Sequence, residues 1–405
     1  MKKIVLVAFI VYSATQVNAQ EKRSILQLNT ITTAVPFLLI APDSRHGALG
    51  DAGVASSPDA NSMHWNAAKM VFNEKEMGIS ISYSPWLREL VKDINLSYVG
   101  FYKKLGKNDD QAIGASLRYF SLGDIKFTNE VGDPIGDFNP AEWAFDLGYS
   151  RKLGDRFSMA LSGRYIYSNL TGGIDVAGQN TKAGTSFAAD VSAFYTNPEA
   201  NLFGEDVSFN LGLNISNIGA KISYTDDAIK DYIPINLKIG QALTFELDDY
   251  NSLTLLTDFN KLLVPTPPVY ATDDSGLPIF DPVTGEREIE SGKDPDVPIV
   301  TGMFQSFGDA PGGFSEELRE INISAGLEYW YNKQFAARFG YFHEDATKGN
   351  RKFFTVGAGL KLSVFSIDFS YLFSTVARNP LANTLRFSLK FDFDDFKKQN
   401  NQPTN

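Results

Sequence analysis

Residues 207–217 read VSFNLGLNISN and carry the pattern that decides the fold. Val, Phe, Leu, Leu and Ile stand at the odd positions from 207 to 215, and Ser, Asn, Gly, Asn and Ser stand between and after them. Successive side chains of a β-strand point to opposite faces, so this period of two places all the apolar side chains on one face. The stretch therefore predicts a strand with one apolar and one polar face.

The same alternation recurs about fourteen times along the chain, in runs of roughly nine to twelve residues, the length that a tilted strand needs to cross a bilayer. The runs begin near Gly78, Ile94, Gln111, Ala141, Phe157, Thr185, Val207, Ile233, Ser252, Glu320, Gln334, Lys352, Ser366 and Leu385. A soluble all-β protein would need two sheets and usually has strands of about five or six residues. The sequence instead predicts an all-β fold, a transmembrane antiparallel outer-membrane β-barrel of about 14 strands over residues 78–393.

The connections between these runs alternate in length, as they do in outer-membrane barrels. Tight ones are Gly154–Arg156, Leu247–Tyr250 and Asn332–Lys333, and longer ones are Gly123–Asn139, Leu170–Gly184, Gly219–Tyr232 and Thr375–Thr384. The connection from Leu263 to Leu318 is far longer and rich in Pro, Gly and Asp, with a turn expected at Asp281–Glu286. Loops of this length usually have a function. Counting strands from a periplasmic start places this connection outside the cell, and Tyr270, Phe280, Phe304 and Phe307 are its expected partner-binding residues.

In such a barrel the apolar face contacts lipid and the polar face lines the lumen. The charged residues predicted to face the lumen are Arg118, Asp146, Arg164, Asp190, Lys238, Asp258, Glu328, Arg338, Lys361, Asp368, Arg386 and Lys390. Charges of both signs fit either water or a plug bound through salt bridges. The aromatic residues expected in girdles at the two membrane interfaces are Tyr98, Tyr119, Trp143, Tyr149, Tyr165, Tyr167, Tyr195, Tyr329, Trp330, Tyr331, Tyr341 and Tyr371.

The stretch from Pro36 to Phe72 has neither period and is the expected plug. It holds Gly47, Gly50 and Gly53 at a spacing of three, among several alanines. Small side chains let two backbones approach closely, and glycine also permits φ > 0. The stretch predicts a compact irregular segment packed inside something, within a hatch or plug domain at residues 20–77.

The two ends of the chain and its composition complete the expected organisation. Residues 1–19 have a positive start, a short apolar core and Val-Asn-Ala before Gln20, which predicts a cleaved secretory signal peptide. Residues 394–405 form a polar C-terminal tail. The net charge of −11 argues against a nucleic-acid partner, and the lack of cysteine excludes disulfides and thiolate metal sites.

Catalytic, cofactor and metal motifs are absent from the sequence: it has no GxSxG elbow, no HExxH, no phosphate loop and no EF-hand spacing. The three histidines, His46, His64 and His343, cannot be placed in a triad from sequence. Polar packing is the simpler interpretation of His46 and His64. We therefore expect no catalytic residue, no cofactor site and no metal site.

The hatch stretch followed by about fourteen strands resembles the outer-membrane long-chain fatty-acid transporter family. Its residues 40–69, IAPDSRHGALGDAGVASSPDANSMHWNAAK, are more closely similar to the PorV family of the type IX secretion system. The positions that carry the resemblance form the expected hatch motif, Ser44, Arg45, Gly47, Gly50, Asp51, Gly53, Pro58, Asp59, Asn61, Trp65 and Asn66. Ala67 departs from the transporter pattern, in which Asn-Pro-Ala is expected, so the transporter's hatch geometry is not carried over directly.

The resemblance implies a non-enzymatic role in protein export at the outer membrane. Its implied partners are the large translocon barrel, secreted cargo with a C-terminal signal domain, a surface attachment complex with a sortase-like peptidase, and outer-membrane lipid or lipopolysaccharide. Two alternatives stay open: an outer-membrane transporter of hydrophobic compounds such as fatty acids, and an enzyme that modifies lipid A or polysaccharide. The first needs a continuous apolar path through lumen and hatch, and the second needs a nucleophile and a base at the rim.

Overall fold

A computed structural model describes residues 28–86, 93–106, 108–128, 131, 133–173, 180–202, 204–225, 230–375 and 383–393. The predicted signal peptide at 1–19 and polar tail at 394–405 lie outside the described residues. The same holds for residues 20–27, the beginning of the predicted hatch domain.

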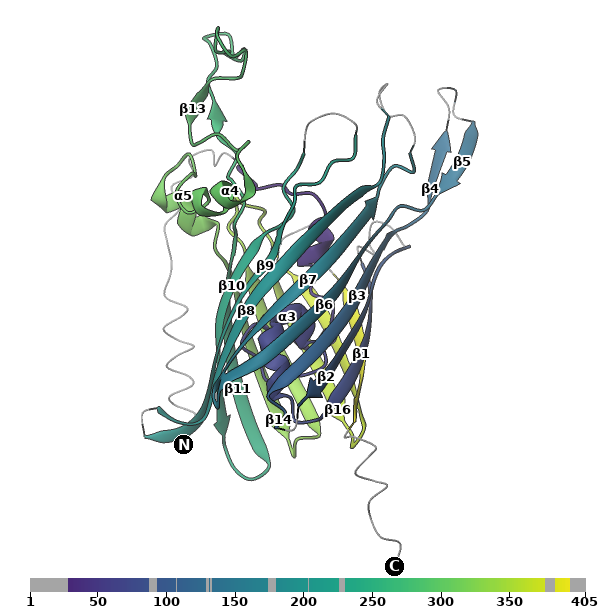
Figure 1. Ribbon diagram of the computed structural model, residues 1–405, viewed down its shortest axis with the longest axis vertical. Helices are drawn as coiled ribbons and strands as arrows, with labels where there is room; N and C mark the ends of the chain where they lie inside the picture. Colours follow the sequence, from purple (N-terminus) through teal and green to yellow (C-terminus); the bar gives the residue numbers. More distant parts are fainter. Residues whose placement is uncertain are drawn as a thin grey trace, which may run out of the picture.

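Fourteen antiparallel strands in the described part of the chain close into one barrel, in the order β1-β18-β17-β16-β15-β14-β11-β10-β9-β8-β7-β6-β3-β2 (Figure 1). They are β1 (Met77–Pro85), β2 (Ile94–Leu105), β3 (Gln111–Leu122), β6 (Ala141–Gly154), β7 (Phe157–Asn169), β8 (Gly184–Leu202), β9 (Glu205–Gly219), β10 (Asn236–Glu246), β11 (Asn251–Leu262), β14 (Asn322–Tyr331), β15 (Phe335–His343), β16 (Lys352–Lys361), β17 (Phe365–Ser374) and β18 (Leu385–Phe393). The predicted barrel and its strand count are confirmed. The largest error in a strand start is at β10, predicted near Ile233 and observed at Asn236.

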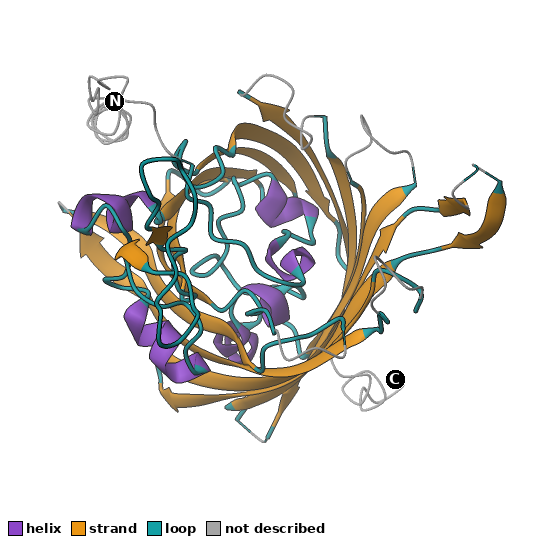
Figure 2. Ribbon diagram, turned by 90° about the horizontal axis from the view of Figure 1, so that it is seen from above, coloured by secondary structure: helices purple, strands orange, loops and turns teal. Residues whose placement is uncertain are grey.

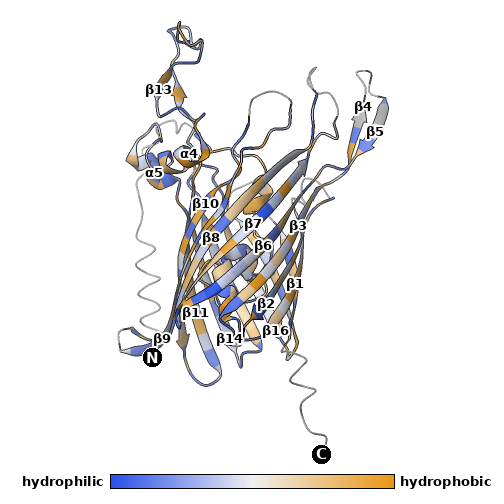
Figure 3. Cartoon of the chain, viewed as in Figure 1, coloured by the Kyte–Doolittle hydropathy of each residue, from blue (hydrophilic) through white to orange (hydrophobic). Residues whose placement is uncertain are grey.

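The two faces of the wall follow the predicted alternation, which is visible as apolar and polar residues succeeding one another along the strands (Figure 3). On β7, Met159 and Leu161 point outward and are 41% and 61% exposed, whereas Ser162 and Arg164 point into the lumen and are buried. Ten of the predicted lumen charges are buried: Arg118, Asp146, Arg164, Asp190, Asp258, Glu328, Arg338, Asp368, Arg386 and Lys390. An apolar belt faces outward, as a barrel in lipid requires.

Two aromatic residues predicted for the girdles face the lumen instead. Tyr98 is 1% exposed and packs edge-on against His64 of the plug, and Trp330 lies under the Arg338 guanidinium at 5.4 Å. Both occupy the inward phase of their strands, where Tyr98 packs against the hatch segment and Trp330 against an inward arginine of the wall. Their assignment to the girdles was wrong.

Residues 36–72, which we call the hatch segment, lie inside the barrel (Figure 2). The segment contains η1 (Pro36–Leu39), α2 (Ser44–Gly47), α3 (Ser62–Trp65) and η2 (Ala67–Phe72), joined by irregular backbone. Its apolar side chains pack against the inward side chains of the wall, including Phe120, Phe194 and Leu256. Among the helices of the described residues, none has the length and apolarity needed to span a membrane.

Tight turns join the strands at one end of the barrel, and longer connections rise from the other end (Figure 1). One of these connections carries a hairpin of β4 (Ile125–Thr128) and β5 (Pro134–Phe138). The connection between β11 and β14, which we call the long loop (residues 263–321), contains β12 (Val269–Tyr270), β13 (Ile289–Ser291), α4 (Ile299–Gln305) and α5 (Phe314–Arg319). It rises from the same end of the barrel as the β4–β5 hairpin, on the other side, and its β13 end extends furthest from the barrel (Figure 1).

Candidate functional site

A buried charge network fixes the hatch segment to the wall. Arg45 donates from Nη2 and Nε to the two carboxylate oxygens of Glu328 on β14, at 2.8 and 3.0 Å. Its Nη1 reaches Asp59 of the hatch at 3.1 Å, and Arg338 on β15 donates to Glu328 at 2.6 Å. Burial would raise the pKa of Asp59, but Lys390 and Arg45 lower it well below its usual value. A bidentate, charge-assisted pair such as Arg45–Glu328 fixes both the position and the orientation of the hatch segment against the wall.

Glycines on both sides let the hatch backbone touch the wall. Gly50 has φ +67°, and its N–H donates to Thr355 Oγ1 on β16 at 3.0 Å. A Cβ on Gly50 would lie 2.5 Å from the carbonyl oxygen of Tyr341 on β15. A Cβ on Gly340, the neighbouring residue of that strand, would lie 2.0 Å from the Gly50 nitrogen. No side chain fits between the two backbones here, so glycine is required on each.

A second backbone contact lies further around the wall, on β11 and β9. The Asp258 carboxylate on β11 accepts hydrogen bonds from the N–H groups of Gly53 and Val54, at 2.7 and 2.9 Å. A Cβ on Gly212 of β9 would lie 2.1 Å from the Val54 carbonyl oxygen. These contacts satisfy backbone groups that have no sheet or helix partner.

Helix α2 of the hatch segment lies against β16, β17 and β18, beside the seam where β18 pairs with β1. The Ser44 N–H donates to Ser388 Oγ on β18 at 2.8 Å, and Ser388 Oγ lies 2.7 Å from Ser82 Oγ on β1. Arg386 on β18 fills the space beside Gly47, where a Cβ would lie 2.4 Å from its guanidinium, and lies 3.4 Å from Asp51. The hatch therefore binds the last strand at the place where that strand pairs with the first.

The interior of the hatch segment contains an Asp–His–Ser row that sequence reasoning missed. His46 Nδ1 lies 2.9 Å from Asp43 Oδ1, and His46 Nε2 lies 2.8 Å from Ser56 Oγ. Trp65 Nε1 donates to Asp43 at 2.7 Å, and Lys69 Nζ donates to Ser56 Oγ at 2.8 Å. The distances match those of a hydrolytic triad.

The surroundings of this row differ from those of a hydrolytic site. Asp43, His46 and Ser56 are all fully buried, and the cavity described below is not lined by any of them. Burial lowers the pKa of Lys69 to about 8. The Lys69 ammonium also donates to the Gly53 carbonyl at 2.7 Å, which ties two turns of the segment together. This row stabilises the fold of the segment.

The other residues of the expected hatch motif divide into buried and partly exposed positions. Asn66 donates to the carbonyls of Val54 and Ala193, at 3.0 and 2.9 Å, and so joins the hatch to β8. Asn61 is buried inside the segment, whereas Pro58 is half-buried in irregular backbone and joins no network.

His64 and Arg118 form a further polar contact between hatch and wall. Arg118 on β3 donates to His64 Nδ1 and to the Leu38 carbonyl, the latter at 2.6 Å. Burial lowers the pKa of His64 well below its usual value, and the Arg118 charge lowers it further. The imidazole is therefore neutral, as an acceptor from a guanidinium must be.

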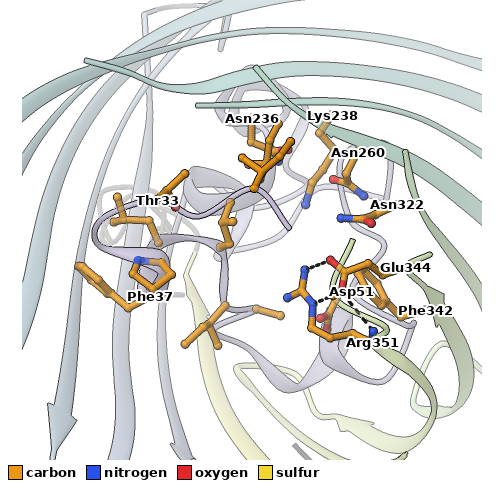
Figure 4. Close-up of a pocket in the computed structure, with 18 of the residues that line it drawn as sticks. Thr33, Phe37, Asp51, Asn236, Lys238, Asn260, Asn322, Phe342, Glu344 and Arg351 are labelled. Atoms are coloured by element: carbon orange, nitrogen blue, oxygen red, sulfur yellow. Dashed lines mark hydrogen bonds and ion pairs between the residues drawn. The ribbon is translucent and has the colours of Figure 1, made fainter. Parts of the chain in front are cut away.

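A cavity of about 840 Å³ lies between the hatch segment and the residues leading to the longer connections (Figure 4). Phe37 and Phe342 belong to its apolar lining. Lys238, Asn260 and Asn322 on three adjacent strands form part of its polar lining, and Asn260 is the register partner of the other two. The Asn260 Oδ1 is buried and has no hydrogen-bond partner. The cavity has the two-sided lining that an amphipathic molecule would need.

The four residues expected to bind a partner lie on two parts of the long loop. Tyr270 and Phe280 belong to the hairpin arm (residues 269–291), where Arg287 stacks on Tyr270 at 4.3 Å and Phe280 is 54% exposed. Phe304 lies on α4 and is 75% exposed, and Phe307 follows this helix and is 52% exposed. The structure does not bring the four together. Within the described residues, no group of three or more His, Cys, Asp or Glu side chains gathers as a metal site would require.

A family model described as type IX secretion system protein PorV matches residues 22–269 of this chain. The chain belongs to the PorV family. The matched part spans the hatch segment and the wall as far as β11, so the protein is an outer-membrane β-barrel and a type IX secretion component. The match ends at the first residue of β12, and most of the long loop lies beyond it.

Solved barrels give a weaker likeness. The CymD monoaromatic hydrocarbon channel is 12% identical, with 88% of this chain and 99% of that chain covered and a TM-score of 0.46. The Ralstonia pickettii toluene transporter TbuX is 9% identical (88% and 100% covered, TM-score 0.46). A Pseudomonas aeruginosa FadL homologue is 12% identical (90% and 100% covered, TM-score 0.45). At these scores the likeness carries no argument about function. The comparison with curated proteins found no match.

Proposed function

We propose that this protein is a non-enzymatic cargo-handling subunit of the type IX secretion system. It binds exported proteins through their C-terminal signal domain at the translocon barrel and passes them to the surface attachment complex. Membership of the PorV family is the observation that carries this proposal. Such a subunit needs a rigid anchor in the membrane and an exposed surface for its partners, and no reacting groups.

The hatch segment and the hairpin arm supply these two requirements. Buried ion pairs such as Arg45–Glu328 hold the hatch segment inside the barrel as a fixed part of the anchor. The hairpin arm carries Phe280, which is 54% exposed, and the half-buried Tyr270, and accessible aromatic side chains are typical binding residues. We propose the hairpin arm, on the extracellular side, as the contact for cargo or translocon.

The test replaces residues 270–289 with a short Gly/Ser linker in the full-length protein in its own cell. Loop length has little thermodynamic cost, and α4 and α5 are retained, so normal amounts of folded barrel are expected. Translocon co-purification or cargo release should be lost. A Phe280→Ala variant should show part of the loss, whereas Val283→Ala, at a position that is 91% exposed on the same hairpin arm, should show none.

Transport of hydrophobic compounds remains the second candidate, and the apolar part of the cavity lining favours it. A labelled fatty-acid uptake assay in the same strains separates the two functions. Normal uptake with lost secretion supports the cargo-handling proposal. Normal secretion with lost uptake contradicts it.

A further inference from the structure

Helix α5 is oriented with its acidic residues toward the protein. Glu317 and Glu320 accept hydrogen bonds from Lys261 Nζ, at 2.9 and 2.6 Å, and Glu320 and Glu316 accept from Lys348 Nζ, at 2.9 and 2.5 Å. Glu317 and Glu320 are 6% and 5% exposed, and both lysines are buried as well. The charged side of the helix is therefore neutralised against the rim of the barrel.

The opposite side of α5 and the outer side of α4 are apolar and exposed. Phe314 and Leu318, one helical turn apart on α5, are 77% and 53% exposed. Val300, Phe304 and Phe307, spaced as i, i+4 and i+7 along α4 and the residues after it, are 63%, 75% and 52% exposed. Surface helices of soluble proteins show the reverse arrangement, with apolar side chains inward. We call these five residues the apolar stripe.

The two helices lie over the wall of the barrel and not over its centre (Figure 2). Lys261, which anchors α5, is on the outward phase of β11, because Asp258 and Asn260 face the lumen. Phe307 has its ring 5.9 Å from the Lys261 ammonium. The next outward residue on β11 is Phe259, 46% exposed and paired in register with Ile323 of β14, which is 38% exposed. The apolar stripe thus continues the lipid-facing belt upward.

We propose that the apolar stripe binds the outer leaflet of the outer membrane, with α4 and α5 lying in the lipid interface. Two observations favour lipid as the partner of the apolar stripe. The stripe is continuous with the lipid-facing belt, and the carboxylates of α5 point toward the protein, where lysines pair with them. An amphipathic segment with its apolar side in the headgroup and acyl boundary is stabilised by the area that it buries there. The neutralised Lys261 suits this position, since an unpaired lysine beside the acyl chains is costly. The long loop then has two environments, lipid for the apolar stripe and water for the hairpin arm.

The native chain has no cysteine, so single cysteines can be spin-labelled cleanly. Phe304→Cys and Leu318→Cys variants of the full-length protein are labelled with a nitroxide and reconstituted alone in phosphatidylcholine vesicles, with and without lipopolysaccharide. Collision rates with oxygen, which concentrates in lipid, and with a water-soluble nickel complex are then measured by power saturation. Leu161→Cys, on the outward face of β7, is the lipid reference, and Val283→Cys, on the hairpin arm, is the water reference.

Both stripe labels should resemble the Leu161 label, with oxygen collisions exceeding nickel collisions. Since no other protein is present, this result can come only from lipid. If both labels resemble the Val283 label, the proposal is overturned and a protein partner must cover the apolar stripe. Heat-modifiable gel mobility confirms the folded barrel for each variant. The two labels lie on different helices, so each gives a separate measurement of the surroundings of the stripe. The measurement does not involve secretion, so its failure is distinct from failure of the cargo-handling proposal.

Discussion

The hatch segment and the long loop are both irregular segments that contain several glycines, yet the structure uses them in opposite ways. In the hatch segment backbone N–H groups such as those of Gly50 and Gly53 are paired with the wall, and glycine removes the side chains that would keep two backbones apart. In the long loop the glycines at turns, such as Gly276 and Gly285, have open space around them. At these positions the same residue type provides close packing in one region and conformational freedom in the other.

The two regions should differ most in how much stability they lose when one arginine is removed from each. Arg45→Ala leaves Glu328 and Asp59 buried with fewer partners, which should lower the free energy of unfolding by about 3–5 kcal/mol. Arg287→Ala removes an exposed cation from the Tyr270 ring and should change the free energy of unfolding by less than about 0.5 kcal/mol. Urea titration of the barrel in vesicles measures both. Equal losses would mean that the hatch segment is no more firmly held than the loop.

A matched pair of glycines tests the role of close packing. Gly50 and Gly285 have similar backbone, with φ +67° and +71°, but only Gly50 has wall backbone within 4 Å of the missing Cβ. Alanine at either position is destabilised by the strain of a left-handed backbone conformation. At position 50 the clash of its Cβ with the wall should cost about 1–3 kcal/mol more. The difference between the two variants in the same titration gives this second contribution. Identical values would show that the hatch yields to an added methyl group.

A smaller effect is expected from the Asp43–His46–Ser56 row. Ser56→Ala removes the partner of His46 Nε2 and one acceptor of Lys69, which should lower the stability by about 1–3 kcal/mol. Secretion by cells with normal barrel levels should be unchanged, because the row is structural. A variant that is as stable as the native protein but fails in secretion or in lipid modification would point to chemistry at Ser56.

The smallest effect is local and lies in the long loop. Asp281 accepts hydrogen bonds from the N–H groups of Val283 and Thr284, at 2.7 and 2.9 Å, and these lower its pKa. Asp281→Ala should speed amide hydrogen exchange in residues 281–286 and leave the barrel unchanged. The native turn should loosen in the same way only as the pH falls through the lowered pKa. The Gly53 and Val54 amides, bound to Asp258, should stay protected throughout.

The local sequence pattern was enough to predict the barrel, because about ten residues of alternating apolar and polar side chains show which face of each strand is which. It was not enough to pair the hatch with the wall. Arg45 and Glu328 are separated by 283 positions, and only the closed barrel brings them together. The girdle assignment of Tyr98 failed for a related reason, since its inward phase becomes favourable only when the hatch segment supplies His64 as a neighbour. The row at Asp43, His46 and Ser56 is nearer in sequence, but irregular backbone gives no period from which to place it.

The contact of the hatch segment with the seam bears on the order in which the molecule is assembled. Ser44 donates to Ser388 of the last strand, and Ser388 is the register partner of Ser82 on the first strand, so the hatch segment is held at the place where the two ends of the sheet pair. The hatch segment precedes the first strand along the chain and fills the lumen that the last strand encloses. We therefore expect the hatch segment to take its place while the sheet is still open, and the final strand to align against it as the barrel closes.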